Sequence, residues 1–288
     1  MDSFGPVAFR RLTVMLPGVT PKAGDSDSQL VISSRPAPGV SHIALNQPES
    51  RNALTESVAK ALRQELASVA ADTTVRVLIV TGNGLAFCAG ADLGSLGADA
   101  ATPAAKRQVL SDYYRAFLDL RDLAIPTIAA VNGPAIGAGL NLALCCDLRV
   151  VADEARLAAP FVKLGIHPGG GATWMLTRVI GPAAAREMLL LGQSIDAERA
   201  LQLGLANRVV PVARLQESAL EWAVSMAGLP APVLRNLKRA LAMVESGESL
   251  EGVLGFETEA QAEALASEDA REGWTALREH RKPEFHDR

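Results

Sequence analysis

A glycine-rich turn inside an apolar stretch is the feature of this sequence that points most directly to chemistry. The apolar run Thr127–Val131 leads into Asn132-Gly133-Pro134, then Gly137-Ala138-Gly139, and then small apolar residues as far as Asp147. This order predicts a strand, a turn and a buried helix. Because the first N–H groups of a helix have no partner within it, such a turn can hold an anion or a developing oxyanion.

Two other interpretations of the same turn stay open at this point. Gly137-x-Gly139 supplies the first two glycines of a dinucleotide-binding fingerprint, but Leu142 occupies the third place. The fingerprint also expects an acidic residue about 20 positions further on, and Asp153 comes earlier than that. A tightly packed strand-to-helix turn without any ligand would give the same pattern.

Composition limits the class of protein. The chain has 288 residues, of which 49% are hydrophobic and 21% charged, as in a soluble globular protein with one or two domains. The net charge of −4 argues against nucleic acid or an anionic membrane surface as the main partner. No apolar run reaches transmembrane length, so we expect no membrane insertion.

The cysteines indicate a reducing compartment. Cys88, Cys145 and Cys146 are odd in number and two are adjacent, which does not fit a disulfide framework. We expect a cytoplasmic protein whose cysteines behave as small buried apolar residues. Three Cys and four scattered His show no metal-ligand spacing, so we expect no metal.

The turn must be positioned by a larger α/β framework. Strands are predicted at 29–33, 40–45, 75–81 and 148–152, and a helix capped by Thr55 is predicted to reach about residue 70. Further helices are expected at 106–123, after the 169–171 glycine run, and after Asp196. Residues 1–28 form an extension without periodicity, 29–210 the core, and 211–288 a helical region broken near Pro230 and Gly247.

Several motifs in a fixed order resemble the crotonase family, also called the enoyl-CoA hydratase/isomerase family. The resemblance covers the chain from about Leu30 to its end. The matching segments are Gln47-Pro48-x-x-Arg51-Asn52-Ala53-Leu54, Phe87-Cys88-Ala89-Gly90-Ala91-Asp92-Leu93, Asn132-Gly133-Pro134-Ala135-Ile136-Gly137-Ala138-Gly139, Cys146-Asp147-Leu148, Gly165-Ile166-x-Pro168-Gly169-Gly170-Gly171, and the tail motifs 267–273 and 281–285.

The resemblance implies an α/β fold with a crotonase-type ββα spiral core and a C-terminal helical trimerisation region. It also implies an acyl-CoA thioester as ligand, with coenzyme A part of that ligand and no separate cofactor, and assembly as a homotrimer or homohexamer. Two backbone N–H groups, those of Ala91 and Ala138, would form an oxyanion hole for the thioester oxygen. The family usually has Gly where Ala138 stands; Ala keeps the N–H but narrows the φ range.

The motifs also imply a set of substrate-binding residues. Asp92 is expected to brace the first oxyanion turn, and Phe161 to line the acyl pocket or simply pack in the core. Lys282, with Arg281, would either reach the CoA phosphates of a neighbouring subunit or belong to a solvated charge run. The complete set is Arg51, Ala53, Ala89, Gly90, Asp92, Leu93, Gly137, Phe161, Pro168, Gly169 and Lys282.

The sequence departs from the family at the two glutamates that hydratases use. Asn141 stands where the first is found, three places beyond the second oxyanion donor, and Phe161 where the second is found. Neither side chain can act as a general acid or base on water, so ordinary hydration should be weak or absent. Asn141 either orients water or the acyl group, or is a satisfied polar residue at a lost catalytic position.

His167 is the remaining candidate for acid–base chemistry. It lies in the loop between Gly165 and the glycine run, where it could act as a base or donor, or simply hydrogen-bond to backbone. We therefore expect an acyl-CoA-binding protein of lipid and fatty-acid metabolism, a lyase or isomerase relative with altered acid–base groups. The alternative is a non-catalytic acyl-CoA carrier or sensor.

Overall fold

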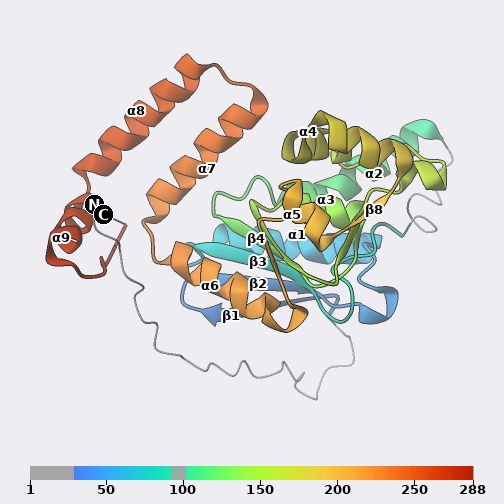
Figure 1. The fold of residues 1–288 in the computed structure, drawn as a ribbon, viewed down its shortest axis with the longest axis horizontal. Coiled ribbons are helices and arrows are strands. Elements are labelled where there is room, and N and C mark those ends of the chain that lie inside the picture. Colours follow the sequence, from blue (N-terminus) through green and yellow to red (C-terminus); the bar gives the residue numbers. More distant parts are fainter. Residues whose placement is uncertain (1–28, 93–95, 97–101, 288) are drawn as a thin grey trace.

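The computed structural model describes residues 29–92, 96 and 102–287 (Figure 1). The predicted extension 1–28 and Leu93 lie outside the described residues. The strands are β1 (Val31–Ala37), β2 (Val40–Leu45), β3 (Val77–Gly82), β4 (Thr127–Val131), β5 (Ala135–Ile136), β6 (Leu148–Ala152), β7 (Arg156–Ala158), β8 (Ser194–Asp196) and β9 (Arg208–Val210). The α-helices are α1 (Glu56–Ala71), α2 (Pro103–Leu118), α3 (Ala138–Leu144), α4 (Ala172–Leu191), α5 (Ala197–Gln202), α6 (Leu215–Ala227), α7 (Ala231–Ser246), α8 (Leu250–Ala266) and α9 (Glu268–Glu279).

The main sheet has the strand order β1-β2-β3-β4-β6-β9. Only β1 runs antiparallel to its neighbour, and the pairs from β2 to β9 are parallel. β3 and β4 are buried at every residue, which is why their sequences are continuous apolar runs rather than alternating patterns. β1 lies at the edge, and after the buried Val31 it alternates between partly buried and exposed residues.

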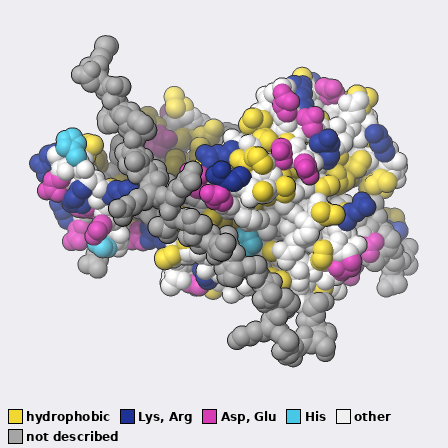
Figure 2. Space-filling view, turned by 60° about the horizontal axis from the view of Figure 1, so that its bottom comes forward, with side chains coloured by type: hydrophobic (Ala, Val, Ile, Leu, Met, Phe, Trp, Pro, Cys, Tyr) yellow, Lys and Arg dark blue, Asp and Glu magenta, His cyan; other side chains and the backbone are white. Residues whose placement is uncertain are grey.

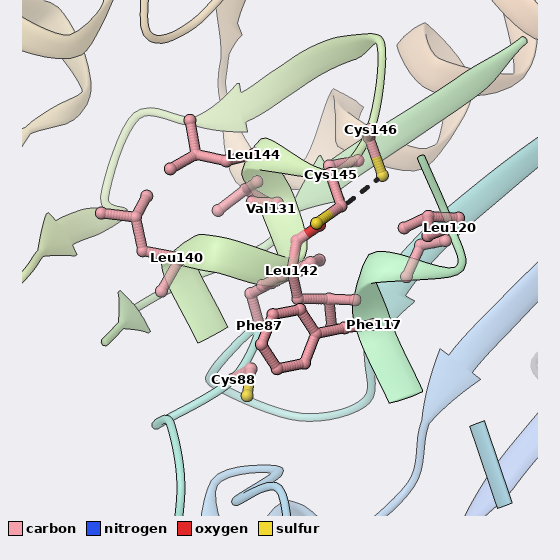
Figure 3. Close-up of a cluster of buried hydrophobic side chains, with 14 of the residues drawn as sticks. Phe87, Cys88, Phe117, Leu120, Val131, Leu140, Leu142, Leu144, Cys145 and Cys146 are labelled. Carbon is pink, nitrogen blue, oxygen red and sulfur yellow. Dashed lines mark hydrogen bonds between the residues drawn. The ribbon is translucent and has the colours of Figure 1, made fainter. Parts of the chain in front are cut away.

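Helices cover both faces of this sheet (Figure 1). On one face, Leu62 of α1, Phe117 of α2 and Leu140 of α3 join the larger core cluster. Figure 3 shows how Phe87, Phe117 and Leu142 lie together in it, with Cys145 and Cys146 close by. On the other face, α6 packs Leu215, Ala219 and Ala223 against the second cluster. The core thus forms the α/β layers that the sequence predicts.

A small second sheet, which the sequence analysis did not predict, lies beside the first. It has the order β5-β7-β8, and its strands have only two or three residues. An isolated bridge between Cys88 and Ala135 joins β5 to the loop after β3. Strands this short have too few residues for an apolar alternation to be visible in the sequence.

Helix ends follow local capping signals, with two differences from expectation. The Thr55 side chain accepts a hydrogen bond from the Val58 N–H, which confirms the predicted cap of α1. α2 begins earlier than predicted because Thr102 caps it and Pro103 takes its first position. In the tail, Ser267 separates α8 from α9 by capping α9, a break beyond those predicted near Pro230 and Gly247.

Helices α7, α8 and α9 project from the layered core, with α7 and α8 side by side (Figure 1). They carry apolar side chains that are mostly exposed, including Leu241, Leu254, Trp274 and Leu277. Among the described residues, no helix combines the length and apolar character needed to cross a membrane.

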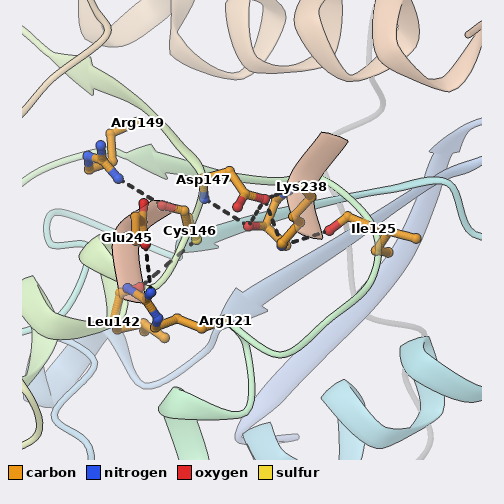
Figure 4. A network of polar contacts seen from close by, with 9 residues as sticks. Arg121, Ile125, Leu142, Cys146, Asp147, Arg149, Lys238 and Glu245 are labelled. Carbon is orange, nitrogen blue, oxygen red and sulfur yellow. Dashed lines mark hydrogen bonds and ion pairs between the residues drawn. The ribbon is translucent and has the colours of Figure 1, made fainter. Parts of the chain in front are cut away.

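A polar network attaches α7 to the core (Figure 4). Lys238 Nζ lies 2.8 Å from Asp147 Oδ2 and donates to the Ile125 carbonyl at 3.0 Å. The same Asp147 oxygen accepts from the N–H and hydroxyl of Thr127, at 2.7 and 2.8 Å. Asp147 therefore links the end of α3, the start of β4 and α7.

Replacing this cation should loosen α7. Lys238→Met keeps an apolar stem of similar length but removes the ion pair and the bond to Ile125. Since the Lys238 side chain is only 15% exposed, we expect the free energy of unfolding in urea to fall by about 1 kcal/mol. Amide exchange in α7 should speed up while β4 stays protected. Unchanged exchange in α7 would show that apolar contacts alone hold this helix.

Candidate functional site

A cavity of about 550 Å³ lies between the loop after β3, the β5–α3 turn, helix α2 and the segment between β7 and α4. It brings together residues that are far apart in the sequence. Its lining residues are Ala89, Gly90, Ala91, Leu96, Leu110, Tyr113, Tyr114, Ile136, Gly137, Ala138, Asn141, Pro160, Phe161, Leu164, Ile166, His167, Pro168 and Gly169.

Two backbone segments on one side of the cavity run alongside each other. Cys88 N donates to the Pro134 carbonyl at 3.1 Å, and Ile136 N donates to the Cys88 carbonyl at 3.0 Å. Gly90 follows with φ of 100°, and a Cβ there would lie 2.6 Å from the Ile136 carbonyl oxygen. Only glycine fits this approach, which sets Ala91 beside the β5–α3 turn.

The N–H groups of Ala91 and Ala138 are the donors of interest. Gly137 has a φ of 54°, and its N–H donates to the Ala158 carbonyl at 2.8 Å. Helix α3 begins at the next residue, Ala138. Among the hydrogen bonds of the described residues, neither the Ala91 nor the Ala138 N–H has an acceptor. Both residues line the cavity, so two donors are available to a ligand there.

Asn141 and Phe161, the two residues that the resemblance sets at the hydratase glutamate positions, also line the cavity. Asn141 is 1% exposed, and its Nδ2 donates to the Gly169 carbonyl at 2.8 Å. The Phe161 ring lies against the Gly137 turn, since a Cβ on Gly137 would be 3.8 Å from it. Asn141 thus has a structural contact on one side, and Phe161 is an apolar wall.

His167 lies in the cavity wall but is exposed. Its Nδ1 lies 2.7 Å from the Pro168 carbonyl. A carbonyl can only accept, so Nδ1 carries the proton, and the neutral ring then presents Nε2 as an acceptor. The backbone contact expected of a structural histidine is present, and a free acceptor remains as well.

Not every predicted substrate-binding residue reaches the cavity. Ala89, Gly90, Gly137, Phe161, Pro168 and Gly169 line it. Arg51, Ala53 and Asp92 are not in its wall, although the Arg51 carbonyl accepts from Ala89 N at 2.9 Å and Asp92 N donates to Leu54 at 3.4 Å. Lys282 follows α9, which Figure 1 shows far from α2 and α3.

Tyr114 is a functional candidate that the sequence analysis missed. It lies one helical turn before Phe117, and Tyr113, Tyr114 and Phe117 form edge-to-face contacts with ring centroids 6.0–6.2 Å apart. Desolvation raises the pKa of the Tyr114 phenol, so it remains a protonated donor. In a chain with 4% aromatic residues, three aromatics within five positions were a usable signal.

The thiols do not supply a nucleophile to this site. Burial raises the pKa of both Cys88 and Cys146 to about 12, and all three cysteines are free and buried. The thiolate is the reactive form, so these side chains stay neutral at physiological pH. Among the described residues, no three His, Cys, Asp or Glu side chains are grouped to hold a metal.

Figure 2 shows basic and acidic side chains interspersed over the visible face.

Comparison with known proteins identifies the family. The family model for enoyl-CoA hydratase/isomerase matches residues 36–288. The Probable enoyl-CoA hydratase EchA14 of Mycobacterium tuberculosis is 45% identical over 214 residues, covering 74% of this chain and 81% of the relative. The 2,3-dehydroadipyl-CoA hydratase of Escherichia coli is 38% identical over 260 residues, covering 90% and 98%.

Solved structures agree with this fold. The enoyl-CoA hydratase of Bacillus anthracis superposes with a TM-score of 0.85 at 33% identity, covering 90% of this chain and 100% of that one. The crotonase-type α/β fold expected from the sequence motifs is therefore confirmed, with helices at its C-terminal end. The chain belongs to the enoyl-CoA hydratase/isomerase, or crotonase, family.

Proposed function

We propose that this protein binds an acyl-CoA thioester and places its carbonyl oxygen between the N–H groups of Ala91 and Ala138. The observation that carries this proposal is the pair of donors without acceptors in one cavity. Negative charge develops on the thioester oxygen when an enolate forms, and fixed donors in a water-poor site stabilise it. A chain of this family acting on a CoA thioester would use the pair in this way.

The chemistry should differ from ordinary hydration. The described residues of the cavity wall include no carboxylate, and their titratable groups are Tyr113, Tyr114 and His167. With Asn141 and Phe161 in place of both glutamates, we propose an enzyme of lipid metabolism with altered acid–base groups. His167 Nε2 is its candidate base.

A non-catalytic acyl-CoA carrier or sensor is the second candidate. The same lack of carboxylates favours it, together with the bond that fixes Asn141 to Gly169. Turnover separates the candidates: a carrier would bind acyl-CoA and return it unchanged.

Assembly as a homotrimer or homohexamer is part of the proposal. The exposed apolar side chains of α7, α8 and α9 support it, because their burial between subunits would remove apolar surface from water. Lys282 could then approach the CoA phosphates of a neighbouring subunit, as the resemblance implies. Sedimentation analysis measures the assembly directly.

Acyl-CoA should bind far more tightly than the free acid or free CoA. Neither part alone joins the thioester oxygen to both amides while placing the acyl group in the cavity and the nucleotide outside it. Calorimetric titration with saturated acyl-CoAs of several chain lengths measures this difference. No binding of any of them would contradict the enzyme and the carrier alike.

A further inference from the structure

A second cavity, of about 330 Å³, lies between the end of α3, the start of β6, the first turns of α4 and helix α7. No described residue lines both this cavity and the larger one. Its apolar wall includes Leu144, Met175, Leu237 and Leu241. Leu237 and Leu241, both on α7, are 54% and 57% exposed, so this apolar space is open to water on its α7 side.

The charged side chains in the wall of this second cavity carry an excess of positive charge. They are Arg121, Asp147, Arg149, Arg178, Lys238 and Glu245, four basic and two acidic. Lys238 Nζ lies 2.8 Å from Asp147 Oδ2, and Figure 4 shows this pair. Arg121 Nη2 lies 2.8 Å from Glu245 Oε2 in the same view. Both carboxylates are therefore paired, and the other two arginines of the wall have no ion pair with a described carboxylate.

Arg149 is the buried cation of this group, with only 6% of its surface exposed. Its Nε donates to the Leu205 carbonyl at 2.7 Å, and its Nη1 donates to the Cys146 carbonyl at 2.8 Å (Figure 4). Its Nη2 donates to no acceptor among the described residues and keeps some solvent-accessible surface. Burial lowers the pKa of Arg149, yet an arginine stays protonated at neutral pH. A buried charge without a counter-ion is unfavourable, so an anion that reaches Nη2 gains affinity.

The second unpaired arginine, Arg178, is used at the rim of the cavity. Its guanidinium lies 3.7 Å from the ring centroid of Trp174, and its Nε donates to the Glu245 carbonyl at 2.9 Å. Arg121 stacks on the same ring at 4.6 Å. These contacts hold Trp174 between two cations at the edge of the cavity, and they leave Arg149 as the cation with an open N–H group.

We propose that this second cavity binds a free carboxylate with an unbranched apolar chain. The carboxylate accepts from Arg149 Nη2, and the chain covers Leu237 and Leu241, which removes their apolar surface from water. One open N–H group beside apolar walls suits a carboxylate better than phosphate, which needs donors on several sides. The ligand would bridge the core and α7. The proposal does not depend on acyl-CoA binding in the larger cavity.

The test compares octanoate with octanol and inorganic phosphate, each titrated into the full-length protein by calorimetry. Octanoate should bind about 10-fold or more tightly than octanol, because hydrogen bonds between charged groups contribute more than neutral ones. Phosphate should bind more weakly than octanoate, since it has no chain to cover the leucines. Equal affinities of octanoate and octanol, phosphate binding as tight as octanoate, or no binding of octanoate would each overturn the proposal.

Tryptophan fluorescence locates the bound octanoate. Trp174 lines the second cavity, so octanoate should change the emission of the wild type. Trp174→Phe keeps an aromatic ring for the arginines but should abolish that change. Trp222→Phe is the matched control and should preserve it, because Trp222 also stacks under an arginine, Arg208 at 4.3 Å, but lies outside the cavity wall. An emission change that persists in Trp174→Phe places octanoate elsewhere and overturns the proposal.

Charge variants test the role of Arg149. Arg149→Met should lower octanoate affinity by about 10-fold, to that of octanol, while octanol affinity stays within about 3-fold. Because Arg149 also bonds two backbone carbonyls, a second variant leaves it in place. Glu245→Gln removes a negative charge from the wall at a residue that is 50% exposed, and should tighten octanoate binding by about 2- to 5-fold without changing octanol binding.

Glu221→Gln is the matched control for Glu245→Gln. Glu221 pairs with Arg208 at 3.3 Å, outside the cavity wall, so its replacement should change neither octanoate nor octanol binding. Unchanged octanoate affinity in Glu245→Gln, or an equal gain in Glu221→Gln, overturns the proposal.

Discussion

The wild-type protein is expected to hydrate a short enoyl-CoA at least about 10⁴-fold more slowly than a family member with both glutamates. Each missing acid–base group typically contributes about 10²–10⁴ in rate. Groups that act as a unit are not additive, so the upper ends are not multiplied. Loss of the enoyl-thioester absorbance at saturating substrate measures the rate. A trace of hydration activity is expected to remain, because the N–H groups of Ala91 and Ala138 can still stabilise the oxyanion.

Restoring both carboxylates tests the cause of this loss. Asn141→Glu combined with Phe161→Glu should raise the rate more than either single change, because one carboxylate positions water and the other exchanges its proton. The structure limits the gain: a carboxylate at 141 cannot donate to the Gly169 carbonyl as Asn141 Nδ2 does. One at 161 enters an apolar wall, where burial raises its pKa.

Val162→Glu is the control for the restored carboxylates. It adds a carboxylate to the same short helix, Phe161–Leu164, at a residue outside the cavity wall, and it should not raise the hydration rate. Rapid hydration by the wild type would refute the premise that the chain lacks acid–base groups for water. In that case His167, whose Nε2 is available as an acceptor, is the first candidate for the base, and His167→Ala should abolish the activity while acyl-CoA affinity stays largely unchanged.

The parts of the site that could be predicted from the sequence are those set by local backbone chemistry. The glycine turn before α3 shows itself through Gly137, which needs positive φ, and through the apolar runs beside it. The cap at Thr55 and the helix restart at Gly181 are also encoded locally, and Gly181 has a non-helical φ of 75°. In each case one residue type dictates a conformation.

The parts that escaped prediction depend on contacts between distant segments. Tyr114 becomes part of the cavity only because α2 packs against the Gly169 loop, 55 residues further along the chain. The resemblance implies Arg51 and Ala53 as substrate contacts, and this stays a prediction: neither lies in the cavity wall, and the Arg51 carbonyl accepts from Ala89 N of that wall. Periodicity reports which face of an element is buried, but not which loop covers it.

Removing the Ala138 N–H should cost about 10²–10³ in the rate of any reaction that passes through a thioester enolate or oxyanion. Ala138→Pro removes this N–H at a position that proline suits, the first of a helix, and its ring Cδ also takes the place of the amide hydrogen at the oxyanion position. The preceding Gly137 has ψ of −115°, outside the α region that proline disfavours in the residue before it. The variant keeps the hydrogen bond from the Gly137 N–H to the Ala158 carbonyl, because that N–H is not at the substituted residue.

The consequence can be measured even before a natural substrate is known. Hydrogen bonds to a thioester oxygen weaken its C=O bond, so acyl-CoA labelled with ¹³C at the carbonyl should show a lower stretching frequency when bound to wild type. Ala138→Pro should lose much of that shift, and exchange of the acyl α-hydrogens in D₂O should slow by the factor above. Glu56→Pro, at the first position of α1 and outside the cavity, is the matched control and should change neither. An unaltered carbonyl frequency in Ala138→Pro would mean that the thioester oxygen binds elsewhere, because no other role of this N–H could polarise that bond.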